Sequence, residues 1–197
     1  LLSLSALIIT GGSLGDLYSR SDFVRDSNGK IYVDANGSVA TDRKTDIDEY
    51  IKLGSVLPKA NMAWRNDFRL QNFNFGFMVT ARLGGVVYSR TQAMLDYYGV
   101  SEASALMRDN GGGHVNDSDL IEANKWYTAI GSGDTVPQYY TYSATNVRLQ
   151  EASVGYTFPK KMMGGLFDLT VQLVGRNLWM IYNKAPYDPE SVASATT

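Results

Sequence analysis

The sequence of 197 residues predicts an all-β protein built from antiparallel strands. Apolar and polar residues alternate over long stretches, which is the pattern of strands with one apolar and one polar face. Asn-Gly pairs supply the positive φ angles that tight hairpin turns require. The chain contains 19 Gly and 13 Tyr, which suits a β protein with many turns, and it contains no Cys, which excludes a disulfide scaffold and a thiolate metal site.

The clearest predicted hairpin joins residues 60–70 to residues 73–83. Apolar side chains dominate the even positions of the first segment and the odd positions of the second, while residues 71–72 are short enough for a tight turn. Each strand is longer than the usual ~5–6 residues. This length is close to the ~9–11 residues with which a strand crosses a bilayer.

A second pair of long strands is predicted near the C-terminal end, joined by a turn at residues 159–165. In residues 146–158 the apolar positions change parity near Gln150 and Glu151, which predicts a β-bulge there. The alternation resumes after the turn, from Leu169 onward.

The segments before and between these hairpins are shorter or less regular. Residues 14–26 are expected to form strand, and residues 30–33 a short extramembrane hairpin between two Asn-Gly turns. Residues 41–58 are expected to be a loop. Residues 91–108 have helical character, interrupted at Gly99.

Two further segments have less definite patterns. Residues 1–10 are apolar and are expected to be a strand whose partners lie upstream, so that the chain is a fragment of a longer protein. Residues 117–142 are expected to be a loop, because Gly131, Gly133 and Pro137 would break a regular element. Loops of this length are usually functional or disordered.

Charge and residue spacing exclude several classes of function. The chain carries 18 Lys and Arg against 20 Asp and Glu, which argues against a nucleic-acid binder. His114 is the lone histidine and has no cluster of acidic or histidine partners at metal-ligand spacing. No nucleophile is followed by a recognisable base, so we predict no catalytic residue, no metal site, no cofactor and no enzyme activity.

Two sets of side chains are candidates for function. Aromatic side chains in the long loop could stack on sugars or pack on peptides; alternatively, they form an interfacial girdle or pack the loop on itself. These ligand-binding candidates are Trp126, Tyr127, Tyr139, Tyr140 and Tyr142. Charged residues of the long hairpin share its polar face and are candidates for a water-filled lumen: Arg65, Asp67, Arg69 and Arg82.

Alternation alone leaves three architectures open. A transmembrane barrel has a lipid-facing apolar face and a polar lumen. A soluble β-sandwich, such as a carbohydrate-binding module of a secreted protein, buries the apolar face in its core. A small closed barrel of about 8 strands is the third possibility.

Several motifs carry a family resemblance. Residues 146–159 (NVRLQEASVGYTFP) resemble a segment near the end of SusC/RagA-type TonB-dependent outer-membrane transporters. Residues 175–179 (GRNLW) and 187–190 (YDPE) are similar to motifs that follow it in that family. Residues 12–18 and 67–75 resemble earlier segments of the same proteins, in the same order.

The resemblance implies that residues 1–197 are the C-terminal part of a large plugged barrel of about 22 strands in a bacterial outer membrane. Residues 89–145 would be a long extracellular loop region containing a short helix. The implied function is nutrient import, with an oligosaccharide or peptide as substrate. The implied partners are a SusD-like surface lipoprotein, membrane lipid, and TonB, which would act through an N-terminal region outside this chain. The terminal aromatic strand usual in the family is also expected to be missing at residues 191–197.

Overall fold

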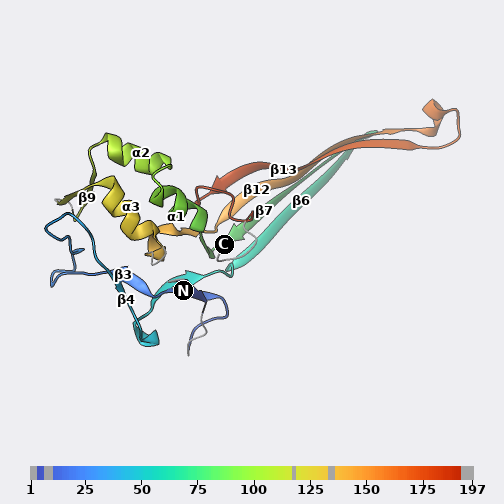
Figure 1. Cartoon of the computed structure of the whole chain (residues 1–197). Coiled ribbons are helices and arrows are strands. Elements are labelled where there is room, and N and C mark those ends of the chain that lie inside the picture. The colour runs from blue at the N-terminus through green and yellow to red at the C-terminus, as the bar shows by residue number, and fades with distance from the viewer. Residues whose placement is uncertain (1–3, 7–10, 117–118, 133–135, 192–197) are drawn as a thin grey trace. The chain divides into compact units, whose positions relative to one another are not determined.

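The computed structural model divides into two compact units (Figure 1). Unit 1 comprises Leu1–Leu57, Val86–Tyr142 and Val192–Thr197, and unit 2 comprises Pro58–Gly85 and Ser143–Ser191. The residues that the structure describes are 4–6, 11–116, 119–132 and 136–191. The predictions for residues 1–3, 7–10, 117–118, 133–135 and 192–197 lie outside this description.

Unit 2 is one antiparallel sheet of four long strands, which Figure 1 shows running side by side. The strands are β6 (Ala60–Leu70), β7 (Phe73–Leu83), β12 (Asn146–Phe158) and β13 (Leu169–Asn183), with the short 3₁₀ helix η3 (Lys160–Met163) in the turn before β13. Their order in the sheet is β13-β12-β7-β6. Both predicted hairpins are therefore confirmed, with the bounds of the first as predicted.

The register gives the sheet one apolar and one polar face. Directly opposed residues share a face, so Phe75 lies beside Val154, and Val154 lies beside Leu173. The apolar face carries Trp64, Phe68, Phe73, Phe75, Phe77, Val154, Tyr156, Val171 and Leu173. No second layer of unit 2 covers it in the described part of the chain, and Trp64 and Leu173 are 63% and 74% exposed.

The predicted bulge is confirmed. The register of β12 shifts between Leu149 and Glu151 against both of its neighbours, β7 and β13. The extra residue, Gln150, donates a hydrogen bond from its side chain to Asn177 Oδ1, 2.9 Å away. Asn177 has a φ of 51°, which accommodates the matching irregularity in β13. The bulge explains why the apolar residues of β12 change parity without leaving the apolar face.

Unit 1 combines short strands with helices. Its strands are β1 (Leu4–Ala6), β2 (Asp16–Ser19), β3 (Ser21–Phe23), β4 (Thr41–Arg43), β5 (Ile51–Ser55), β8 (Val86–Tyr88), β9 (Gly113–Val115), β10 (Asp119–Ile121) and β11 (Thr141–Ser143). Its helices are α1 (Arg90–Tyr97), α2 (Glu102–Asp109) and α3 (Ala123–Gly131), with 3₁₀ turns η1 (Ile47–Glu49) and η2 (Pro137–Tyr140). The strands pair as β1-β2-β5, β3-β4, β8-β11 and β9-β10.

Unit 1 has a hydrophobic core drawn from distant parts of the sequence. Its buried members are Leu4, Leu17, Phe23, Tyr88, Ala93, Ile130, Val136 and Tyr140. They come from small sheets, from α1 and α3, and from the η2 turn. Burial of this apolar surface is what holds the short elements together, because strands of three residues are not stable alone.

The structure corrects three predictions about unit 1. Residues 41–58 are not all loop, because β5 (Ile51–Ser55) pairs with β2 and directs Leu53 against the core. β1 pairs with β2, which lies downstream and not upstream. Residues 117–142 are not all loop, because they contain α3 and the η2 turn. Gly131 is the last residue of α3 and Pro137 is the first residue of η2, so both lie at the end of a regular element and interrupt neither.

The helical prediction for residues 91–108 is confirmed in outline. α1 and α2 are separated by a break at Gly99, whose φ of 70° favours glycine. The N-cap residue of each helix is a serine, Ser89 or Ser101, whose side-chain oxygen accepts a hydrogen bond from a backbone N–H of the first turn. No helix among the described residues is long and apolar enough to cross a membrane.

A buried carboxylate fixes the start of β2. Asp16 accepts hydrogen bonds from Lys52 Nζ at 2.5 Å, from the Ser13 backbone N–H at 2.9 Å and from Ser13 Oγ at 2.8 Å. The Lys52 contact, followed by the two Ser13 donors, lowers the pKa of Asp16 to about 2. The same contact raises the pKa of Lys52.

We predict an acid-sensitive β2–β5 pairing. Because the folded pKa of Asp16 lies below its unfolded value of about 3.9, its stabilisation is complete above pH 4 and is lost as the pH falls through about 2. Amide hydrogen exchange in β2 and β5 measures the effect. The ratio of the exchange rates of the Asp16→Asn variant and the wild type should be largest near neutral pH and should approach one toward pH 2. A ratio that does not change with pH would contradict the assignment.

We also predict that α1 and α3 cannot tolerate a side chain at Gly131. A Cβ atom there would lie 2.7 Å from the Ala93 carbonyl oxygen and 3.0 Å from Tyr97 Cβ. Gly131→Ala should cost about 1–3 kcal/mol through overpacking, and hydrogen exchange in both helices should become about 5- to 160-fold faster. Thr128→Ala, at an exposed position of the same helix, is the control and should change little. Equal rates of hydrogen exchange in the two variants would contradict the predicted overpacking between α1 and α3 at Gly131.

Candidate functional site

The four residues predicted to face a lumen share one face of the unit 2 sheet. Arg65, Asp67 and Arg69 alternate along β6, and Arg82 of β7 lies opposite Asn61 of β6, on the same face. Register therefore brings all four together on the polar face, as the alternation predicts.

Glu151 connects these charges across the sheet. Its carboxylate lies 3.8 Å from Arg65 Nη1 and accepts a hydrogen bond from Arg176 Nε at 3.2 Å. Arg65 also donates to Asp67, with Nε 2.8 Å from Oδ2. The row runs from β6 over β7 to β12 and β13, with carboxylates and guanidinium groups in alternation. Sequence reasoning missed Glu151 and Arg176, because they become neighbours only through strand pairing.

A glycine makes room for this row at β7. A Cβ atom on Gly76 would lie 2.6 Å from Asp67 Oδ1 and 2.8 Å from Ser153 Oγ. These polar side chains lean over the glycine from the strands on either side. The polar face is therefore closely packed at this point.

Two of the predicted aromatic residues, Trp126 and Tyr139, form a cluster with Phe23 in unit 1. The ring of Trp126 stacks on that of Phe23 with centroids 5.4 Å apart, and Tyr139 meets Trp126 edge-on at 5.5 Å. Tyr139 is exposed, whereas Phe23 is buried. The cluster packs helix α3 against the β3 region, and its outer edge at Tyr139 is open to solvent.

The other predicted aromatics have different surroundings. Tyr140 is only 2% exposed and belongs to the core, so its ring is not available to stack on a ligand in this structure. Burial, followed by the charge of Asp96, raises the pKa of Tyr140. Tyr142 is half-buried in β11. Tyr127 is half-buried and lines a cavity.

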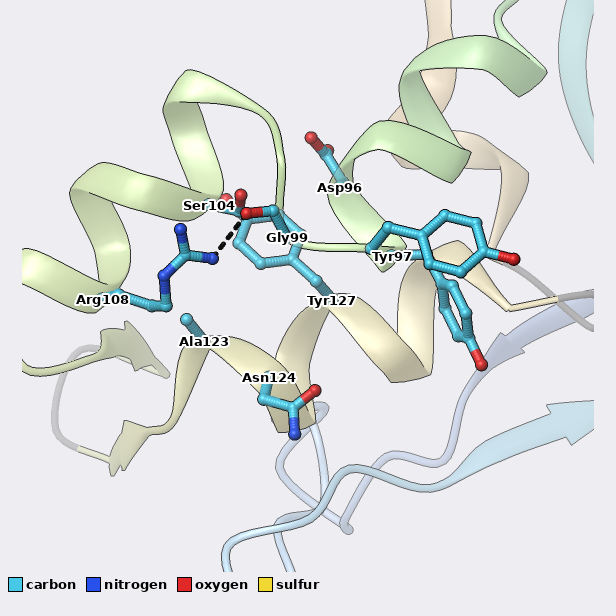
Figure 2. A pocket seen from close by; sticks show the side chains of 9 residues that line it. Asp96, Tyr97, Gly99, Ser104, Arg108, Ala123, Asn124 and Tyr127 are labelled. Atoms are coloured by element: carbon cyan, nitrogen blue, oxygen red, sulfur yellow. Dashed lines mark hydrogen bonds between the residues drawn. The ribbon is translucent and has the colours of Figure 1, made fainter.

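That cavity, of about 190 Å³, lies among α1, α2 and α3 (Figure 2). Its lining residues are Asp96, Tyr97, Tyr98, Gly99, Ser104, Arg108, Ala123, Asn124 and Tyr127. Figure 2 shows Arg108 directed toward the Gly99 carbonyl oxygen, to which it donates a hydrogen bond of 2.7 Å. Apart from Tyr127, these residues were not predicted from the sequence, since they converge only when the helices pack.

A second ionic cluster explains the Tyr-Asp-Pro-Glu motif at residues 187–190. Buried Arg148 of β12 donates from Nη2 to Asp188 Oδ1 at 2.7 Å and lies 3.3 Å from Glu190 Oε2. Asn146 donates to the other Glu190 oxygen at 3.2 Å. The motif therefore holds the segment after β13 against the start of β12, and its acidic residues have a structural role within unit 2.

Among the described residues, no group of three or more His, Asp or Glu side chains could hold a metal ion. His114 is exposed in β9. In the 26–29 turn, Asp26 Oδ1 accepts hydrogen bonds from the backbone of Asn28 and Lys30, which is the predicted turn geometry.

Comparison with known proteins adds one curated relative. TonB-dependent receptor P3 of Formosa agariphila is 25% identical to the chain over 180 residues, which is 84% of this chain and 16% of that receptor. No protein-family model matches the chain. The chain thus corresponds to about a sixth of the length of this relative.

Solved structures of RagAB share the fold. The RagAB peptide importer in its 'closed-closed' state matches with a TM-score of 0.57 at 16% identity, and the RagAB peptide transporter with a TM-score of 0.58 at 15% identity. The 'open-open' state of the importer gives 0.58 at 14% identity. Each match covers 97% of this chain and 22% of the other chain.

These matches confirm the predicted fold class, a segment of an antiparallel transmembrane β-barrel. The similar proteins are a receptor and importers, not enzymes. In sequence and in fold, the chain is similar to TonB-dependent transporters of the SusC/RagA type, as the motifs at residues 146–190 predict.

Proposed function

We propose that this chain forms part of the wall and of the extracellular region of an outer-membrane nutrient importer. The observation that carries the proposal is the unit 2 sheet, whose apolar face is exposed and whose opposite face is charged. Soluble proteins rarely leave large contiguous apolar patches in water. A barrel wall requires this arrangement, with lipid on one side and an aqueous lumen on the other.

Strand length supports the same placement. β6 and β7 have 11 residues each, which at ~3.3 Å per residue gives strands of about 36 Å. Tilted by ~45°, such strands rise about 25 Å, the height of the apolar band of outer-membrane barrels. The aromatic rings at the turn end of the sheet suit an interfacial girdle: Phe73 and Tyr156 meet at 4.9 Å, and Tyr156 and Phe158 at 4.7 Å.

The edges of the sheet are consistent with a larger barrel. β6 and β13 each pair on one side only among the described strands. Unpaired strand edges are open to further pairing, and a closed barrel removes them. We propose that other strands of the longer protein pair there, and that Arg65, Asp67, Arg69 and Arg82 face the enclosed lumen.

The lengths of the connections between strands indicate which end of the sheet is periplasmic and which is extracellular. The turn at Gln71 and Asn72 and the turn of residues 159–168 lie at one end, and the chain leaves β7 and re-enters β12 at the other. Outer-membrane barrels have short periplasmic turns and longer extracellular loops. Residues 89–145, which include α1, α2 and α3 of unit 1, are therefore proposed to be extracellular.

The proposed partner of this region is a SusD-like surface lipoprotein. The RagAB structures that share the fold are described as peptide importers, so we propose a peptide or an oligosaccharide as the cargo. TonB would energise import through parts of the longer protein outside this chain. We propose that four aromatic residues contact the cargo: the exposed Tyr139 and the half-buried Trp126, Tyr127 and Tyr142.

A soluble carbohydrate-binding sandwich is the alternative. It requires a second sheet over the apolar face, and the described part of unit 2 contains one sheet only. Phe73 and Phe75 are exposed, whereas a sandwich would bury them.

Pairs of adjacent residues provide a direct test of the membrane placement. Cysteine is absent from the chain, so single cysteines can carry a fluorophore in the full-length protein once any others are removed. In lipid vesicles, brominated lipid should quench fluorophores at Phe75→Cys and Leu173→Cys, and aqueous iodide should quench those at Asn74→Cys and Gln172→Cys. Neighbours lie at nearly equal depth, so only the face differs. Equal quenching within each pair would sink the proposal.

The partner proposal is tested at the exposed apolar side chains of the α1–α2 region. Val100→Glu and Leu106→Glu introduced together should weaken co-purification of the lipoprotein at least tenfold, because each places a charge on an exposed apolar position. Leu166→Glu, in the turn at the opposite end of the unit 2 strands, is the control and should leave co-purification unchanged. Equal loss in both variants, or in neither, would place the lipoprotein elsewhere.

A further inference from the structure

The cavity among α1, α2 and α3 carries a carboxylate with an unusual environment. Asp96 is 6% exposed; its Oδ1 accepts a hydrogen bond from Gln92 Nε2 at 2.9 Å, and the Tyr140 hydroxyl is its second hydrogen-bonding neighbour. It forms no ion pair with any residue in the described part of the chain. Buried carboxylates are usually paired with a cation or fully hydrogen-bonded.

The position of Asp96 in its helix increases the demand for positive charge. Asp96 precedes Tyr97, the last residue of α1. The carboxyl end of a helix carries the negative end of the helix dipole, which disfavours a second negative charge there. No Lys, Arg or His lies in the last turn of α1 to offset it. A cation that enters the cavity would relieve both effects.

A positive group lines the same cavity from α2. Arg108 uses one of its guanidinium N–H groups for the Gly99 carbonyl oxygen, and a guanidinium group has five such donors. Arg108 has no carboxylate partner at ion-pair distance among the described residues, and it does not pair with Asp96 (Figure 2). The cavity therefore presents two opposite charges that are not neutralised by each other.

Tyrosine side chains complete the wall. Tyr97 and Tyr98 meet edge-to-face with centroids 5.1 Å apart, and the face of a tyrosine ring attracts ammonium groups. Burial, together with the charge of Asp96, raises the pKa of Tyr127, so its phenol stays neutral and able to donate a hydrogen bond. Asn124 and Ser104 add further polar groups.

We propose that this cavity binds a small zwitterion, such as a free amino acid, with its ammonium group toward Asp96 and its carboxylate toward Arg108. The volume of about 190 Å³ is below the ~300–1,000 Å³ of sites for drug-sized ligands, which suits a ligand of a few heavy atoms. The site lies within unit 1 and shares only Tyr127 with the residues proposed to meet the cargo, and binding to it is measured without transport. Its failure and the failure of that function are therefore separate outcomes.

The test is calorimetric titration of the full-length protein in detergent with three probes of similar size. L-Alanine carries both charges, ethylamine only the ammonium group and propionate only the carboxylate. L-Alanine should bind at least tenfold more tightly than either analogue, because two charge-assisted contacts add. Equal binding of the three probes, or tighter binding of ethylamine or propionate than of L-alanine, would overturn the proposal.

Variants assign the two ends of the ligand. Asp96→Asn should weaken binding of L-alanine and ethylamine about tenfold or more and leave binding of propionate unchanged. Arg108→Gln should weaken binding of L-alanine and propionate and leave binding of ethylamine unchanged. Asp48→Asn makes the same chemical change on the exposed η1 turn and is the control, with no effect expected. Because Arg108 is exposed, Arg108→Gln tests the site even if Asp96→Asn does not fold. Unchanged L-alanine binding in Arg108→Gln would refute the assignment.

Discussion

Register between β7 and β12 is the constraint on which the long sheet depends. These two inner strands pair the β6–β7 hairpin with the β12–β13 hairpin. A slip of one residue between them would therefore move every side chain of one hairpin to the opposite face of the sheet. The bulge at Gln150 is part of this constraint, because it absorbs the change of parity within β12. The apolar face therefore stays continuous from Phe75 through Val154 to Leu173.

Ionic contacts reinforce that register on the polar face and at one end of the sheet. Glu151 lies between Arg65 and Arg176 on strands that are not adjacent to each other, and Arg148 holds Asp188 and Glu190 beside the start of β12. Most of these side chains are partly exposed, so each contact contributes modestly to stability. Their main effect is to favour one strand register over others, since a shifted register would separate all of these ion pairs at once.

Unit 1 obeys a different constraint, the sharing of one core by many short elements. Leu17, Phe23, Ala93 and Tyr140 come from widely separated segments, and no element has enough apolar surface to be stable alone. This arrangement leaves polar side chains at the helix ends, and there Asp96 and Arg108 come to border one cavity. The same packing withdraws Tyr140 from solvent, although its sequence position suggested a ligand contact.

The sequence by itself determined the long strands, their faces, the bulge and the break at Gly99. These features depend on the alternation of apolar and polar residues along a strand and on the backbone preferences of single residues. Both can be read from residues that are close together in the sequence. Only the tertiary structure decided that Ile51–Ser55 is a strand, that α3 exists, that Tyr140 is core and that Glu151 joins two arginines. Each depends on partners far away in sequence, and the free energy of burial and pairing with those partners outweighs the weak local signal.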